Sequence, residues 1–253
     1  MGERNRLGRA LGALAQLVYP RVCAACEAAL DDADLGIVCG RCWARAPRLR
    51  HPQCDRCGHP RAARGDCPGC ALLPPFIRSA RSWCWVPHDT SSRILSALKY
   101  YGWYAVAEAM GERLARLEFP PDVVAERSAL IAVPLAREKR RARGYNQADA
   151  IAAAVARRWA LPHWDDVLLR TRDTPSQTRL TPGERLANVH RAFSLGAGAE
   201  ERIRGRHLVL VDDVLTTGAT LNACATVLFE AGARTLSYLT FGRARSGASA
   251  DRL

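Results

Sequence analysis

The spacing of apolar and polar positions changes at about residue 78, and from there short apolar runs alternate with amphipathic segments. The apolar runs predict strands over 79–86, 129–134, 166–170, 207–211 and 234–242. The amphipathic segments predict helices over 90–102, 104–119, 147–160 and 219–232, the first with Thr90 or Ser91 as its N-cap. Strands that alternate with helices require crossover connections, so the pattern predicts an α/β fold with a largely parallel sheet.

The first 20 residues follow a different pattern, an apolar stripe at helical spacing formed by Leu7, Leu11, Leu14 and Val18. We interpret this segment as an N-terminal amphipathic helix, because Gln16 interrupts the apolar stretch that a signal peptide would need. No apolar run reaches the roughly 18–20 residues that span a bilayer. The sequence therefore predicts a cytoplasmic protein without a transmembrane segment, and peripheral contact of the helix with the inner membrane stays open.

Eight of the ten cysteines lie within residues 23–70, in four C-x-x-C pairs. They are Cys23, Cys26, Cys39, Cys42, Cys54, Cys57, Cys67 and Cys70. One such pair places two thiolates on a tight knuckle, and two knuckles complete a four-cysteine shell around zinc. The repetition predicts two structural zinc ions. Disulfides and an iron–sulfur cluster stay open as alternatives, although adjacent cysteines of this spacing form strained disulfides.

The pairs can share metal ions sequentially or in an interleaved order. Sequential sharing joins 23/26 with 39/42 and 54/57 with 67/70, and we favour it because it closes the shorter loops. Cys84 and Cys224 lie outside the pairs, and both are expected in the core. The predicted organisation is a helix over 1–20, a double zinc ribbon over 21–75, an α/β domain over 78–243 and a flexible tail over 244–253.

The chain is strongly basic, with a formal net charge of +12, although 25% charged residues is an ordinary share for a globular protein. Arginine supplies nearly all of the positive charge, since Lys99 and Lys139 are the only lysines. This balance favours anionic partners such as nucleotides, phosphorylated metabolites or nucleic acid. Five cations cluster at 137–143, directly after a predicted strand; a solvated or DNA-facing surface is the alternative to a ligand site.

The stretch LVLVDDVLTTGAT at 208–220 carries the clearest chemistry. An apolar strand is followed by Asp212 and Asp213, and then by a loop of threonines around Gly218 that leads into a helix. Two adjacent carboxylates repel each other unless a cation or hydroxyl donors lie nearby. Backbone N–H groups at a helix N-terminus bind anions. The pattern predicts a phosphate in the loop beside a diol and a divalent ion, whereas helix capping alone would need one such side chain.

This stretch resembles the signature with which type I phosphoribosyltransferases bind phosphoribosyl pyrophosphate (PRPP). Together with the four C-x-x-C pairs, ALKYYG, VPLAREKRRARGYNQA and LLRTRDTPSQTRLTPGERLANVHRAF, it makes the chain resemble the ComF family over about residues 20–243. The resemblance implies a parallel sheet of the type I phosphoribosyltransferase kind, with helices on both faces, preceded by a small zinc-ribbon module. It also implies PRPP and Mg²⁺ as ligands.

The resemblance further implies roles for individual residues. Asp212 and Asp213 would bind the ribose hydroxyls, directly or through Mg²⁺ on Asp213, and would share the catalytic role with Arg172. The 5′-phosphate would be held by Thr216, Thr217, Gly218, Ala219 and Thr220, and the other phosphates by Lys99, Arg140 and Arg143. The polar segment 170–188 resembles a hood that closes over the active site, with Gln177 and Arg185 at recurring family positions.

The function expected from the resemblance is PRPP binding, with transfer of the phosphoribosyl group to an acceptor that the sequence does not identify. Whether the protein is an enzyme is left undecided. The alternative is a non-catalytic protein that binds single-stranded DNA during uptake, using the positive charge and the aromatic residues Trp83, Trp85, Tyr100, Tyr101, Trp103 and Tyr104. A third possibility is that the ribbons contact a helicase or another protein partner.

Overall fold

The computed structural model describes residues 20–31, 36–60, 67–100, 104–171 and 192–245. The expected N-terminal helix over 1–20 and most of the expected tail lie outside these residues. So does the greater part of the predicted hood, including Arg172, Gln177 and Arg185.

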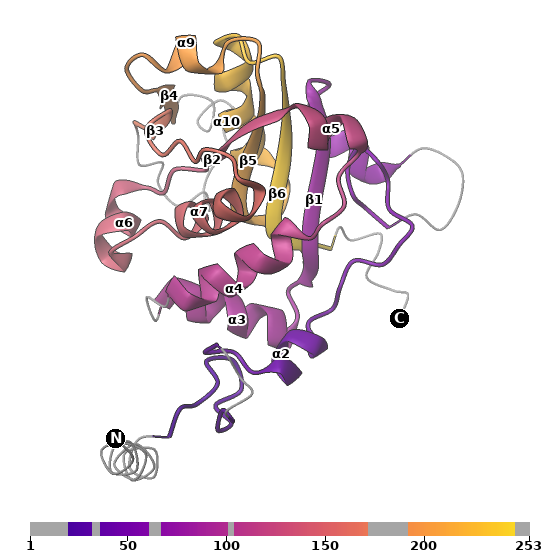
Figure 1. Cartoon of the computed structure of the whole chain (residues 1–253), viewed down its shortest axis with the longest axis vertical. Helices are drawn as coiled ribbons and strands as arrows, with labels where there is room; N and C mark the ends of the chain where they lie inside the picture. Colours follow the sequence, from indigo (N-terminus) through magenta and orange to yellow (C-terminus); the bar gives the residue numbers. More distant parts are fainter. Residues whose placement is uncertain (1–19, 32–35, 61–66, 101–103, 172–191, 246–253) are drawn as a thin grey trace, which may run out of the picture.

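The main sheet is parallel throughout, and its strands stand in the order β1-β6-β5-β2. These strands are β1 (Ile77–Val86), β6 (Thr235–Ala244), β5 (His207–Leu215) and β2 (Arg127–Ala132). All four therefore end at the same edge of the sheet, which is where parallel α/β sheets bind their ligands (Figure 1).

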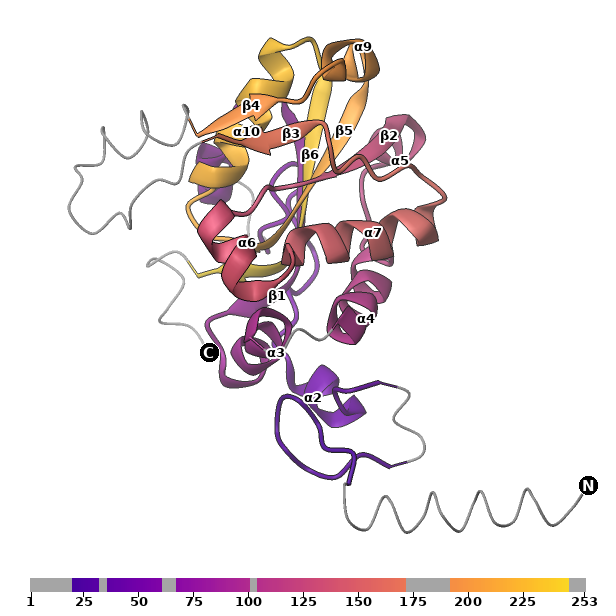
Figure 2. The same cartoon turned by 90° about the vertical axis from the view of Figure 1, so that its left-hand side faces the viewer.

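Helices cover both faces of the sheet (Figure 2). One face packs against α3 (Asp89–Tyr100), α4 (Tyr104–Ala115) and α7 (Gln147–Trp159), and the other against α9 (Ala199–Ile203) and α10 (Ala219–Glu230). Successive residues of β5 divide between the two cores: Val209 and Val211 pack on the first face, Leu208 and Leu210 on the second. Since both faces are buried, the strand is apolar without alternation. The predicted α/β fold with helices on both faces is confirmed.

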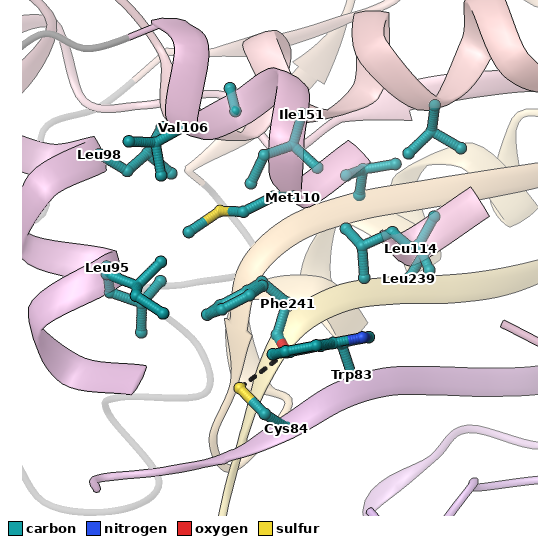
Figure 3. Close-up of a cluster of buried hydrophobic side chains, with 14 of the residues drawn as sticks. Trp83, Cys84, Leu95, Leu98, Val106, Met110, Leu114, Ile151, Leu239 and Phe241 are labelled. Carbon is teal, nitrogen blue, oxygen red and sulfur yellow. Dashed lines mark hydrogen bonds between the residues drawn. The ribbon is translucent and has the colours of Figure 1, made fainter. Parts of the chain in front are cut away.

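The core beneath α3, α4 and α7 is built around aromatic and sulfur-containing side chains (Figure 3). The rings of Trp83 and Phe241 stack with centroids 5.4 Å apart, and Met110 is fully buried in the same cluster. α4 and α7 approach so closely that a Cβ on Gly111 would lie 2.4 Å from the Cβ of Ala154. Glycine at 111 is therefore what permits this helix crossing. Cys84 and Cys224 are buried in the core, as expected.

The remaining elements differ in part from the sequence predictions. They are α2 (Gly40–Arg45), a 3₁₀ turn η1 (Pro68–Leu72), α5 (Pro121–Glu126), α6 (Arg137–Arg143), β3 (Leu168–Arg170) and β4 (Phe193–Leu195). The strand predicted at 166–170 does not join the main sheet; it shortens to β3 and pairs antiparallel with β4. The cation run at 137–143 forms α6, which no apolar periodicity predicts.

Two boundary predictions are wrong for identifiable reasons. The helix expected to be capped by Thr90 or Ser91 begins already at Asp89. The Ser91 hydroxyl instead donates to the carbonyls of Trp85 (2.8 Å) and His88 (3.2 Å), tying the helix to the end of β1. β5 does not end at residue 211 but continues to Leu215, because residues 212–215 still pair with β6.

The two cysteine modules lie on opposite faces of the sheet, and the segment that joins them runs alongside β1. The first, with Cys23 and Cys42, belongs to the core under α3 and α4. The second, with Cys54 and Cys57, belongs to the core on the α10 face. Between them, residues 46–49 pair with β1: Leu49 N–H donates to Trp83 O (3.4 Å) and Trp85 N–H donates to Pro47 O (2.8 Å). The segment between the modules thus covers the outer edge of β1.

Buried arginines fasten the second module to the sheet. Arg81 of β1 donates to the carbonyls of Cys54 and Asp55, at 3.4 and 3.0 Å. Arg243 of β6 donates to the carbonyl of Cys57. Each guanidinium offers several donors in a fixed plane, so one side chain satisfies carbonyls that the irregular cysteine loop leaves unpaired. The second module is therefore part of the main fold rather than an appendage.

A buried histidine at the opposite end of the sheet makes stability depend on pH. His207 Nε2 lies 2.9 Å from Ser237 Oγ, and Nδ1 lies 3.7 Å from Glu126 Oε2. Ser237 is inaccessible, so this serine–histidine–acid arrangement cannot reach a substrate. Burial lowers the pKa of His207. As pH falls, the unfolded chain therefore protonates at His207 before the folded chain does. The contribution of neutral His207 to the free energy of unfolding is complete above about pH 6.5 and is lost as pH falls further.

We expect the melting temperature to fall between about pH 7.5 and pH 5.5, with a slope from this residue of at most about 1.4 kcal/mol per pH unit. Differential scanning fluorimetry of wild type and His207→Gln checks this, because the glutamine variant should show a flatter profile. Parallel profiles would mean that other groups cause the acid sensitivity.

Candidate functional site

The eight cysteines form two four-thiol clusters, with the Sγ atoms of each cluster within 4.8 Å of one another. Neighbouring Sγ atoms are 3.8 Å apart for Cys23–Cys42 and Cys26–Cys39, 3.6 Å for Cys54–Cys70 and 3.3 Å for Cys57–Cys67. A tetrahedral shell with bonds of about 2.3 Å separates its sulfurs by about 3.8 Å. The clusters therefore fit two structural zinc ions, with sequential sharing as predicted. All ten cysteines are free of disulfides.

Local backbone geometry prepares both clusters for metal. The N–H groups of Ala25 and Cys39 point at Cys23 Sγ, at 3.4 and 3.2 Å, which favours the thiolate. In the second cluster Gly58 has φ +68°, and a Cβ there would lie 2.4 Å from the carbonyl oxygen of Ala80. Glycine is therefore needed both for the turn of the knuckle and for its contact with β1.

The acid pair lies in the second half of β5, toward the carboxyl edge of the sheet. Since consecutive side chains of a strand point to opposite faces, the two carboxylates have different surroundings. Asp213 forms an ion pair with Lys99 Nζ, from the last turn of α3. Asp212 lies on the α10 face, where its Oδ1 accepts a hydrogen bond of 2.8 Å from the Asp213 N–H. The structure thus joins Lys99 to the motif across a long sequence separation.

The electrostatics of the pair are unfavourable without a ligand. Burial, followed by repulsion from Asp213, raises the pKa of Asp212 well above its usual range. Nearby Cys224 is a buried thiol whose pKa is also raised by burial and by Asp212. A carboxylate placed where its charge is poorly solvated is typical of functional sites rather than of structural ones.

The loop after β5 presents hydroxyl and N–H donors at the start of α10. Thr216 and Thr217 are exposed, and Gly218 is buried with φ +79°. The first N–H groups of a helix have no partner within the helix, so they are available to an anion. The N–H of Ala219 donates weakly to Thr217 Oγ1 at 3.4 Å. The loop therefore has the donors that the phosphate prediction requires.

Asn222 anchors this loop, and the sequence analysis missed it. Its Nδ2 donates to the Leu72 carbonyl of the second cysteine module at 2.9 Å, and its Oδ1 accepts from the Tyr238 hydroxyl at 2.9 Å. Its position four residues after Gly218, on the first turn of an otherwise apolar helix, was the available signal. The zinc module and the loop are in this way connected by a direct hydrogen bond.

A cavity of about 300 Å³ lies at the carboxyl end of β2. Its lining combines the loop after β2, α6, the start of α7 and β3, and includes Arg137, Arg140, Asn146, Asp149, Arg170 and Thr171. Arg140 therefore lies where the sequence placed an anion-binding cation. Arg143 does not line the cavity; its guanidinium donates to Gln147 Oε1 at 3.1 Å.

Asn146 shows how the sequence forms this wall. Its Oδ1 accepts from the Ala148 N–H at 3.2 Å and caps α7, while its Nδ2 donates to the Val133 carbonyl at 3.0 Å. One side chain thus fixes the loop after β2 to the helix that follows α6. Asn146 belongs to the GYNQ segment quoted above, but we predicted no role for it. Arg170 and Thr171 were likewise not predicted to line a site.

Comparison with known families divides the chain into two matched parts. Residues 14–71 match the double zinc ribbon domain, and residues 147–252 match the phosphoribosyl transferase domain. No helix in the described parts of the chain is long and apolar enough to cross a membrane.

Relatives match over most of the chain. The DNA utilization protein YhgH of Salmonella typhi is 33% identical over 232 residues, covering 87% of this chain and 96% of the relative. Competence protein ComFC of Bacillus subtilis is 27% identical over 203 residues, covering 77% of this chain and 79% of the relative. Among solved structures, glutamine PRPP amidotransferase from B. subtilis is similar over 56% of this chain and 30% of its own, at 19% identity and a TM-score of 0.39.

Proposed function

The chain belongs to the ComF family, and from this premise we propose that it binds PRPP at the carboxyl edge of its sheet. The observation that carries the proposal is the acid pair Asp212–Asp213 followed by the donor-rich loop at the start of α10. Neither feature is needed for folding, since a cap requires one side chain and the acid pair is electrostatically unfavourable.

Each part of PRPP has a complementary group. The 5′-phosphate would lie against Thr216, Thr217 and the N–H groups that begin α10, and the ribose hydroxyls would donate hydrogen bonds to the carboxylates of Asp212 and Asp213. The pyrophosphate would lie toward the cavity that contains Arg140. Carboxylate oxygens are the ligands that Mg²⁺ prefers, so Asp213 fits this ion. When bound, Mg²⁺ would stabilise the negative charge of the departing pyrophosphate.

Transfer of the phosphoribosyl group requires no side-chain nucleophile. The bond from C1 of the ribose to pyrophosphate breaks with its electron pair leaving on pyrophosphate, and an acceptor nitrogen forms the new bond to C1 and loses a proton. Arg140, in the lining of the cavity, would stabilise the leaving group electrostatically. The proposal includes enzymatic transfer and a cytoplasmic location. The catalytic role of Arg172 stays a prediction, because this residue lies outside the described residues.

Isothermal titration calorimetry of the zinc-loaded full chain with PRPP and Mg²⁺ tests the binding. We expect a dissociation constant between about 1 μM and 1 mM. Thr217→Val should weaken binding about tenfold or more, because a hydroxyl donor to a charged phosphate is lost. Thr226→Val, in the helix that follows this loop and with its hydroxyl donating to the Asn222 carbonyl, is the control and should bind as wild type does.

Pyrophosphate release with a panel of amines and nucleobases then tests transfer. We expect pyrophosphate release with only one of the acceptors, at a rate well above the rate of PRPP hydrolysis. Absence of PRPP binding in the calorimeter would overturn the proposed function, whereas binding without release from any acceptor would remove only the enzymatic part.

A second candidate function is binding of single-stranded DNA, and one cluster of cations supports it. A cavity of about 290 Å³ lies between α2, β1 and α4 and is lined by Arg48, Arg113 and Arg116, the last of which pairs with Glu112 at 2.7 Å. The guanidinium of Arg113 lies 3.8 Å from the ring centroid of Trp43, and that of Arg48 lies 4.7 Å from that of Trp83. Rigid cations held on aromatic faces suit the phosphates of a flexible strand.

The aromatic residues themselves give this idea less support than the sequence suggested. Trp83 is buried in the core, and Tyr104 is 61% exposed while its ring stacks on Tyr145. Trp85 is half-buried, and the other three lie where the structure describes no side chain. Arginines rather than aromatic rings would thus carry the contact. A helicase or other protein partner stays a prediction from the sequence.

Fluorescence anisotropy with a short labelled oligo-dT, between about 50 and 200 mM salt, tests DNA binding. The double variant Arg48→Gln/Arg113→Gln should bind more weakly and with a shallower salt dependence. Arg202→Gln/Arg206→Gln removes two arginines that lie 4.8 and 5.7 Å from the ring centroid of Trp164, and this variant should bind as wild type does. An equal loss of DNA affinity in both variants would mean that net charge alone causes the binding, and it would overturn a dedicated site.

A further inference from the structure

Lys99 contributes the cation that contacts the acid pair. Its ammonium forms an ion pair with the Asp213 carboxylate, and the two side chains keep only 26% and 20% of their surface exposed. The lysine comes from the C-terminal turn of α3, and the Leu98 carbonyl beside it accepts the Tyr145 hydroxyl. Because the helix end is held in this way, the ammonium is presented to Asp213 rather than left free in solvent.

The residue type is informative in this chain. Lysine and arginine together number 37, and only Lys99 and Lys139 are lysines. Arginine therefore supplies the positive charge at most positions, and in the described parts of the chain it forms the ion pairs with aspartate and glutamate in which neither Lys99 nor a histidine takes part. An ammonium differs from a guanidinium in being a compact point charge with three rotatable donors. Of the two side-chain cations, the ammonium is therefore the one that resembles a small metal ion more.

A tethered ammonium competes with a free metal ion for the same carboxylate. Its effective concentration beside Asp213 is in the millimolar range or above, as for any group held by a short connection. A free divalent ion must displace it and leave the lysine charge without its partner. A metal ion already bound to a sugar pyrophosphate meets a different balance, because the pyrophosphate offers the displaced ammonium new acceptor oxygens.

We propose that Lys99 is a built-in counter-cation of Asp213, which excludes free divalent ions from the acid pair and moves to the pyrophosphate when the metal–PRPP complex binds. The inference rests on the proposed PRPP site and adds to it a criterion of selection: the site takes the metal complex of a sugar pyrophosphate and rejects the metal alone. Lys99 thereby acts as a specificity-determining residue.

Mn²⁺ binding, read from the electron paramagnetic resonance signal of the free ion, tests this on the zinc-loaded full chain. Without PRPP, Lys99→Gln should bind Mn²⁺ about tenfold more tightly than wild type, a difference of about 1.4 kcal/mol. With PRPP present the order should reverse, since the variant lacks the ammonium that the pyrophosphate receives. Arg93→Gln, an equal charge change on an exposed position of the same helix, should match wild type in both arms.

Lys99→Arg keeps the charge and should keep free Mn²⁺ excluded, which separates the ion pair from a general loss of structure. Equal Mn²⁺ affinity of wild type and Lys99→Gln overturns the counter-cation assignment, whether or not PRPP binds. Failure of wild type to bind PRPP with Mn²⁺ overturns the proposed function, and the comparison without PRPP still reports on Lys99 and Asp213.

Discussion

Replacing Cys57 with serine should halve the zinc content and lower the melting temperature of the whole chain by on the order of 10 °C. Cys57 is fully buried, belongs to the core on the α10 face, and its carbonyl accepts a hydrogen bond from Arg243 of β6. Loss of the metal therefore disturbs the central fold as well as the cysteine module. Zinc analysis by mass spectrometry and a calorimetric melting curve measure the two effects.

The control is Cys224→Ala, which changes a cysteine of the same core outside the metal clusters. It should keep both zinc ions, with only the modest loss of stability that a small cavity brings. Two zinc ions retained by Cys57→Ser, or an unchanged melting temperature, would contradict a structural metal integrated with the sheet. The Leu72–Asn222 hydrogen bond extends the expectation, because the damaged module should also weaken PRPP binding.

Replacing Asp212 with asparagine should raise the melting temperature of the ligand-free chain while PRPP binding falls about 30-fold or more. The asparagine removes a charge that is poorly solvated and repelled by Asp213, so the folded state gains. The same charge would be needed for the ribose diol, so the ligand loses an ionised acceptor. A thermal melt and a calorimetric titration of one preparation give both results.

Opposite changes in stability and in affinity distinguish a ligand site from a structural acid. If Asp212 held the fold together, its replacement would lower the melting temperature. Asp166→Asn is a suitable comparison, because it also removes a carboxylate, one that pairs with Arg202 at 2.7 Å on the surface. That variant should lose at most about 1 kcal/mol and keep PRPP binding.

Local sequence patterns predicted the parallel sheet, its main helices and both four-cysteine clusters, because each depends on spacing within one segment. The acid pair and its loop were likewise recognisable as one continuous stretch. The pattern did not predict α6, since REKRRAR has no apolar face; the helix ends where Gly144 adopts φ +78° and its N–H donates to Arg140 O. Arginine content alone could not distinguish this helix from a loop.

Long-range contacts were the other limit. Nothing in the sequence around Lys99 specifies that the ammonium reaches Asp213, and nothing around Asn222 specifies its bond to Leu72. These contacts arise only when the whole sheet is assembled. The same holds for the two cysteine modules, whose placement on opposite faces follows from the path of residues 46–49 along β1 rather than from cysteine spacing.

The segment that joins the two modules also covers an edge strand of the sheet. β1 is one of the two outer strands of the sheet, and an uncovered outer strand offers its N–H and carbonyl groups to strands of other molecules. Residues 46–49 and the second module occupy those groups, with Ala80 N–H donating to Arg56 O at 2.7 Å. Loss of zinc from the second module would therefore free N–H and carbonyl groups of β1 to pair with strands of other molecules.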